Sequence, residues 1–273
     1  MSAESAVPGS EVCVEQVYPT ADELPENLLR VYFYFSKPMH PDVAHHAIKL
    51  VDQDGGVVSG AFLETEAGLW SSDRRRLSIL LNPGRVKRGL DARDSMGSAI
   101  VAGNSYAFVV EAGAMALDGS RLAETYSRAF TVTEPDRQPP DPGRWIVSEP
   151  RRGTRDPLTV VLDGSVDHAS LAYRVRVIEE TRGVVPGRLE LGEHEKRWVL
   201  IPDDPWAVGT YSLRVAPDLE DPSGNRPGRP FEQRGTSGPE PVRLIPVRIA
   251  PPPQDILHDG STTTSGPPER QHG

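Results

Sequence analysis

Three histidines and one aspartate form the densest group of potential metal ligands in the sequence. They are His40, Asp42, His45 and His46. Imidazole nitrogens combined with carboxylate oxygens suit borderline metal ions such as copper and zinc. A copper or zinc site in this loop is therefore one hypothesis. A loop that caps the fold with solvated histidines explains the same residues without a metal, and this is the interpretation that we expect to hold.

A second group of residues with recognisable chemistry consists of arginines, namely Arg74, Arg75, Arg76, Arg85 and Arg88. Guanidinium groups bind carboxylates and phosphates in a bidentate geometry, so these residues are candidates for binding a partner protein. Aspartates at positions 73, 91 and 94 lie among them. The alternative is therefore a solvated hairpin tip whose charges pair internally.

Residues 218–225 place several side-chain oxygens at the short spacing that calcium requires. The segment does not match a twelve-residue calcium loop with its terminal glutamate. Turn formation explains the same residues, because Asp221 and Asn225 can bond their own backbone while Gly224 supplies a positive φ. We expect a turn here, with calcium as the alternative.

The sequence contains none of the strong catalytic motifs. It has no Gly-x-Ser-x-Gly elbow, P-loop, Gly-x-Gly-x-x-Gly or His-Glu-x-x-His. The single cysteine, Cys13, excludes thiolate-rich zinc sites, and we expect it to be buried on the first strand. We predict no catalytic residues and no cofactor. The alternative is an enzyme whose site lies in an interdomain groove or in the loop of residues 40–46, which predicts a cleft with perturbed titratable groups.

Charge and hydropathy limit the partners. The chain has 30 Lys and Arg against 39 Asp and Glu, a net charge of −9, so it lacks the basic footprint that binds a phosphate backbone. No apolar run approaches the ~20 residues that a membrane span needs. Residues 1–12 show no secretory leader, which predicts a cytoplasmic location. We therefore expect a protein partner, and neither nucleic-acid binding nor membrane insertion.

Hydrophobic patterning predicts strands. In residues 29–35 the apolar Leu29, Val31, Phe33 and Phe35 alternate with Arg30, Tyr32 and Tyr34, a period of two that is typical of a half-buried strand. Further strands are expected in residues 11–18, 57–63, 77–81, 106–110 and 128–132, with one helical turn over 42–46. The 25 glycines and 27 prolines favour turns between short strands.

The second half of the chain repeats the order of sequence segments found in the first half. The corresponding segments are 31–40 and 159–168, 58–64 and 185–191, 77–83 and 197–202, and 103–110 and 209–215; each half should end in a strand with a phenylalanine, Phe130 or Phe231. The sequence predicts an all-β protein with a sandwich over residues 12–133, a Pro-rich linker over 134–144, a second sandwich over 145–249 and a disordered C-terminal tail over 250–273.

These segments carry a resemblance to a known family. The motif Phe35-Ser36-Lys37-Pro38-Met39, Gly103 with Tyr106, Gly209 with Tyr211, and Asp221 with Gly224-Asn225 resemble the bacterial Ig-like domains of surface-layer and other cell-envelope proteins. The resemblance implies two tandem Ig-like antiparallel β-sandwiches, a cell-envelope location and a non-catalytic binding or structural role through protein–protein interaction. The histidine loop also looks like a position where a related Ig-like fold, the periplasmic copper-resistance C proteins, presents metal ligands; their ligand motif is not matched here.

Overall fold

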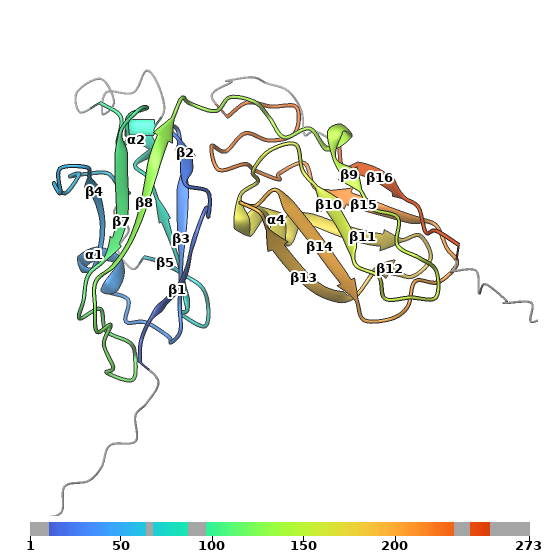
Figure 1. The fold of residues 1–273 in the computed structure, drawn as a ribbon, viewed down its shortest axis with the longest axis horizontal. Coiled ribbons are helices and arrows are strands. Elements are labelled where there is room, and N and C mark those ends of the chain that lie inside the picture. Colours follow the sequence, from blue (N-terminus) through green and yellow to red (C-terminus); the bar gives the residue numbers. More distant parts are fainter. Residues whose placement is uncertain (1–10, 64–67, 87–96, 232–240, 252–273) are drawn as a thin grey trace, which may run out of the picture.

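The computed structural model describes residues 11–63, 68–86, 97–231 and 241–251, which form two β-sandwiches placed one after the other (Figure 1). Each sandwich has its own hydrophobic core and consists of two four-stranded sheets. The predicted fold class, an all-β chain with two successive β-sandwiches, is confirmed. The predicted tail lies outside the described residues from residue 252 onward.

The first sandwich packs two sheets face to face. One sheet has the order β1-β3-β6-β5, formed by β1 (Val14–Tyr18), β3 (Arg30–Phe35), β6 (Arg76–Leu80) and β5 (Leu69–Trp70). The other has the order β2-β8-β7-β4, formed by β2 (Glu23–Pro25), β8 (Tyr126–Thr133), β7 (Ser105–Val110) and β4 (Ile48–Asp52). All pairs are antiparallel except β2 with β8. Two helical turns, α1 (Val43–His46) and α2 (Pro83–Val86), connect strands.

The second sandwich has a closely similar arrangement. Its sheets have the orders β13-β14-β10-β9 and β12-β11-β15-β16. The strands are β9 (Ile146–Val147), β10 (Leu158–Val161), β11 (Val175–Glu179), β12 (Gly183–Val184), β13 (Gly187–Gly192), β14 (Arg197–Pro202), β15 (Tyr211–Val215) and β16 (Arg243–Val247), and the helices are η1 (Pro142–Arg144) and α4 (His168–Arg174). Read from its other edge, the first of these sheets has the order β9-β10-β14-β13. This order repeats the connectivity of the sheet β1-β3-β6-β5 in the first sandwich.

The alternation predicted for residues 29–35 is present in β3. Val31, Phe33 and Phe35 are fully buried in the first core, where Phe33 meets Phe108 of the facing sheet edge to face. Tyr32 on the opposite face is also buried, with 4% of its surface exposed. The outer face of this sheet is therefore covered as well, and the covering group comes from the second sandwich.

Several local predictions were wrong. Residues 57–63 form only isolated bridges, Val57 with Val51 and Phe62 with Leu81, because this segment crosses from one sheet to the other. Cys13 is exposed. Phe231 lies in no strand; it packs against the core of the first sandwich, and the second sandwich ends on β16 instead.

Helices are short throughout the described ranges. The longest, α4, has seven residues, and none in these ranges is long and apolar enough to cross a membrane.

Candidate functional site at the junction of the two sandwiches

The four residues of the histidine loop do not converge on one point. His40 Nδ1 lies 3.3 Å from Asp42 Oδ2, and both residues line a hollow of about 240 Å³ together with His46. His45 lines a different groove of about 600 Å³, which His46 also borders, and the two ring centres are 6.3 Å apart. The part of the chain that the structure describes contains no group of three or more His, Cys, Asp or Glu residues placed to hold a metal ion.

The arginines predicted to bind a partner have separate environments. Arg85 is buried and donates to three backbone carbonyls, those of Ser59, Gly97 and Ser98, so its guanidinium holds a loop together. Arg75 is exposed and pairs with Glu15, while Arg74 takes a positive φ of 54° in the turn before β6. Arg76 lies 6.0 Å above the ring of Tyr32. Arg88 lies outside the described residues.

Buried polar side chains concentrate elsewhere, between the two sandwiches. Nine polar or charged residues are buried in the described ranges. Seven of them lie in the region where residues 18–34 meet residues 167–231, which we call the junction: Asn27, Asp167, Glu195, Glu220, Asp221, Ser223 and Asn225. Because burying a polar group is costly unless it is hydrogen-bonded, the partners of these groups determine what the junction does.

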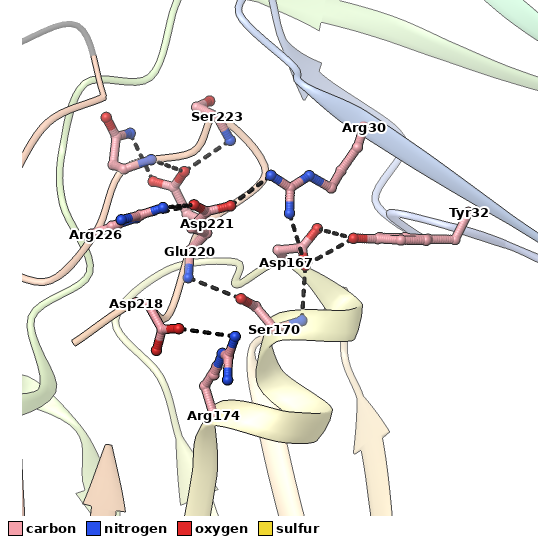
Figure 2. Close-up of polar contacts among 11 residues, drawn as sticks. Arg30, Tyr32, Asp167, Ser170, Arg174, Asp218, Glu220, Asp221, Ser223 and Arg226 are labelled. Carbon is pink, nitrogen blue, oxygen red and sulfur yellow. Dashed lines mark hydrogen bonds and ion pairs between the residues drawn. The ribbon is translucent and has the colours of Figure 1, made fainter. Parts of the chain in front are cut away.

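Asp167 is the central residue of the junction (Figure 2). It is the N-cap of α4 and accepts a hydrogen bond from the Ser170 amide at 2.8 Å. Its two carboxylate oxygens also accept from the Tyr32 hydroxyl at 2.9 and 3.0 Å. The same carboxylate thus caps the N-terminus of a helix in the second sandwich and binds the outer face of β3 in the first sandwich.

Glu220 forms the second bridge, together with two arginines (Figure 2). Its Oε2 accepts from Arg30 Nη2 at 2.6 Å across the junction, and its Oε1 accepts from Arg226 Nη2 at 2.6 Å. Arg30 Nη1 is also 4.0 Å from Asp167 Oδ1. Burial raises the pKa of Asp167 and the Arg30 guanidinium opposes that rise, so the arginine offsets part of the cost of burying the carboxylate.

Glu195 forms a third bridge from a constrained turn. Its carboxylate accepts from the Thr20 amide at 3.0 Å and from the Thr20 hydroxyl at 2.8 Å. Residues 193, 194 and 195 all have positive φ, between 53° and 59°. Three successive non-glycine residues in the left-handed region are unfavourable, so the surrounding contacts must hold this turn in place.

The turn at Asp221 forms the fourth contact region. Asp221 accepts from the backbone amides of Ser223 and Asn225 and from the Asn225 side chain, as the turn interpretation of this segment requires. Ser223 Oγ then donates to Asn27 Oδ1 of the first sandwich at 3.0 Å. Burial raises the pKa of Asp221 to about 7, and the nearby Asp136 adds to the rise.

His168 fills the aromatic part of the junction. Its ring stacks on Tyr18 with a centroid distance of 3.5 Å and meets Tyr34 edge to face at 5.6 Å. Its Nδ1 is buried and has no hydrogen-bond partner in the described structure. Burial, and secondarily the positive charge of Arg76, lowers the pKa of His168 to about 4, so the imidazole is neutral at pH 7.

His168 should make stability depend on pH. Because its pKa is near 6.5 in the unfolded chain and about 4 in the folded one, the unfolded state binds the extra proton between these values, and stability falls as the pH is lowered. We expect wild type to lose about 2–3 kcal/mol relative to His168→Phe between pH 7 and pH 4. Urea unfolding of both proteins at several pH values measures this difference.

The comparison with His168→Phe isolates the imidazole. Phenylalanine preserves the stack on Tyr18 but binds no proton. The buried carboxylates, whose raised pKa values act in the opposite direction, are common to both proteins and cancel in the difference. Parallel pH profiles for the two proteins would contradict the assignment.

The junction has clustered titratable groups but lacks the volume of a substrate site. The cavity that Asp221 lines together with Asp136 and Asp163 has a volume of about 80 Å³, whereas ligand pockets measure ~300 Å³ or more. Tyr32, Asp167 and Glu195 are each hydrogen-bonded across the junction, and Asp221 is hydrogen-bonded within its own turn. The arrangement therefore fixes one sandwich against the other.

The junction was not predicted from the sequence. Alternation placed Arg30, Tyr32 and Tyr34 on the polar face of a strand, and two of these three residues are aromatic. An aromatic outer face indicates a covered surface. Asp167 directly before a short helical segment was a further signal, since aspartate is a preferred helix N-cap residue.

Comparisons with known proteins give only distant likenesses. No family model matches the sequence, and no curated protein matches it. Similar solved structures include CopC from Methylosinus trichosporium OB3b, at 17% identity over 47% of this chain and 99% of that chain, with a TM-score of 0.30. Native alpha-2-macroglobulin from Escherichia coli, spanning domains MG0-NIE-MG1, is 14% identical over 88% of this chain and 72% of that one, also with a TM-score of 0.30.

A third similar structure is the S-layer protein rSbsC(31-844), at 11% identity over 88% of this chain and 41% of that chain, again with a TM-score of 0.30. Likenesses at this level carry no functional argument.

Proposed function

We propose that this protein is a non-catalytic structural and binding module that holds two Ig-like sandwiches in one fixed orientation and presents their outer surfaces to another protein. The observation that carries the proposal is the junction. Its buried carboxylates bind groups of the opposite sandwich, at Tyr32, Arg30 and Thr20. A flexible tether between independent domains needs no such contacts.

The four contact regions constrain rotation as well as separation. The Glu195 bridge and the Asp167 bridge reach different points on the first sandwich, Thr20 beyond the end of β1 and Tyr32 on β3. The backbone itself contributes a bond, from the Leu29 amide to the Pro222 carbonyl at 2.9 Å. Several separated attachments between two bodies define their relative orientation.

An alternative role as a metal-binding or catalytic protein receives no support from a particular observation. The histidines at positions 40, 45 and 46 do not converge, and the junction cavity is small. The cell-envelope location implied by the family resemblance stays a prediction.

Residual dipolar couplings of the full-length protein test the proposal. We expect the amides of both sandwiches to fit one alignment tensor with one relative orientation. A variant that combines Arg30→Gln, Tyr32→Phe and Thr20→Ala removes the Arg30 guanidinium and the Tyr32 and Thr20 hydroxyls. The backbone amides of Thr20 and Leu29 stay in place. In that variant the degrees of alignment that the dipolar couplings give for the two sandwiches should differ by about a factor of two, because the sandwiches then reorient independently.

Lys49→Gln is the matched control. Lys49 pairs with Glu111 inside the first sandwich and away from the junction. This control should leave the single tensor unchanged. Two independent tensors in the wild-type protein would refute the proposed function, and so would an unchanged tensor in the triple variant.

A further inference from the structure

We propose that the outer face of the sheet β12-β11-β15-β16 is a docking surface for an acidic protein segment that carries apolar side chains. The inference rests on the proposed function and deepens it, since it names the surface and the chemistry of the partner. The sheet lies in the second sandwich (Figure 1). Its inner face packs in the core, where Leu213 and Val215 are fully buried.

The residues on the outer face follow from the register. Arg176 of β11 lies opposite Arg214 of β15, and Arg214 lies opposite Leu244 of β16. Side chains alternate along a strand, so these three residues share the face opposite to Leu213 and Val215. Leu244 is 62% exposed.

A second row continues the same face with apolar and small residues. Ile178 of β11 is flanked by Val184 of β12 on one side and by Ser212 of β15 on the other, and Ser212 lies opposite Pro246 of β16. Val184 is 55% exposed and Pro246 is exposed. The face thus combines one cationic row with an adjacent apolar row.

Arg176 and Arg214 are placed unfavourably when no partner is bound. Like charges directly opposite each other on neighbouring strands destabilise a sheet. In the described part of the chain neither guanidinium pairs with a carboxylate: Arg176 Nη1 donates to the carbonyls of Ala172 and Val175, and Arg214 has no hydrogen bond or ion pair. Carboxylates placed over this row would turn the repulsion into a bidentate contact.

A groove extends the surface toward the linker. About 460 Å³ in volume, it is lined by prolines 139, 140, 142 and 227 and by Arg243, Leu244 and Ile245. Leu244 therefore belongs to both the sheet face and the groove. A rigid, proline-lined hollow beside a cationic row suits an apolar anchor side chain on a segment that carries carboxylates.

The charge pattern selects this partner over a second copy of the chain. In a symmetric dimer through this face, the same patch would meet itself and bring Arg214 close to arginines of the other copy. Such a like-charge contact opposes association. A protein segment with alternating acidic and apolar residues complements both rows.

A strand-like probe peptide with the sequence Glu-Val-Glu-Leu-Glu-Val tests the proposal. Titrated into the full-length ¹⁵N-labelled protein, it should shift amides of β11, β15 and β16. Arg214→Glu should weaken binding by about tenfold or more. The same variant should raise Tm by ~1–3 °C, since it replaces a cross-strand repulsion by an attraction to Arg176.

Arg188→Glu is the matched control, with the same change in net charge. Arg188 lies on β13 of the other sheet, where it pairs with Glu190. It should leave peptide binding unchanged and should not raise Tm. The uncharged peptide Gln-Val-Gln-Leu-Gln-Val should not bind measurably.

Four results would overturn the docking surface: no shifts at millimolar peptide, equal weakening by Arg188→Glu, a lower Tm in Arg214→Glu, or sedimentation showing that the chain associates with itself through this face. The dipolar couplings that test the fixed orientation of the sandwiches do not depend on Arg214. Failure of the docking surface is therefore distinguishable from failure of the proposed function.

Discussion

Replacing Asp167 by alanine is expected to lower the free energy of unfolding by about 3 kcal/mol. The loss has two physical causes. Alanine leaves the Tyr32 hydroxyl without this acceptor at a buried position and takes away one of the two carboxylates near Arg30. It also removes the N-cap of α4. Asp167 is 3% exposed, so water cannot replace the lost contacts without opening the junction.

Urea unfolding followed by tryptophan fluorescence measures this effect, because Trp145, Trp198 and Trp206 all lie in the core of the second sandwich. Asp42→Ala provides the control. Asp42 is also at a helix N-cap position, that of α1, but it makes no capping hydrogen bond and its side chain is 70% exposed. We expect Asp42→Ala to change stability by less than about 0.5 kcal/mol. Equal losses in the two variants would show that the junction contributes nothing.

Strand alternation shows what patterning predicts from the sequence. Alternation in β3 predicted the buried Val31, Phe33 and Phe35, because a strand period is local and depends on adjacent residues. Alternation also existed in β11, where Val175 and Val177 are buried, but that strand was not predicted. The local signals of the strands that were predicted, such as β3, were sufficient for the fold class even though β11 was missed.

Contacts between distant residues could not be predicted in this way. Tyr32 and Asp167 are 135 positions apart, and no local pattern indicates that they meet. Phe231 shows the same limit: its place in the sequence suggested a last strand of the second sandwich, whereas it packs against the first core. The residues with the strongest local chemistry, at positions 40–46, form no group in the described structure that is placed to hold a metal ion.

Gly224→Ala should destabilise the protein by about 3 kcal/mol, because two unfavourable effects act at one position. Gly224 has a φ of +80°, a conformation that costs other residues ~1–2 kcal/mol. An added Cβ would also overlap Leu29 Cδ1 of the first sandwich and lie 3.0 Å from Phe231 Cδ2. Overpacking of this kind costs ~1–3 kcal/mol. Urea unfolding of the variant measures the sum.

Gly119→Ala separates the two effects. Gly119 has nearly the same φ, +84°, but nothing lies within 4 Å of a Cβ there. Gly119→Ala should lower the free energy of unfolding by only about 1 kcal/mol, which is the cost of the backbone conformation. The excess loss in Gly224→Ala then measures the close approach between the turn of residues 221–225 and Leu29. If the two glycines gave the same loss, the close approach of Gly224 to Leu29 and Phe231 would add nothing to the cost of the extra Cβ.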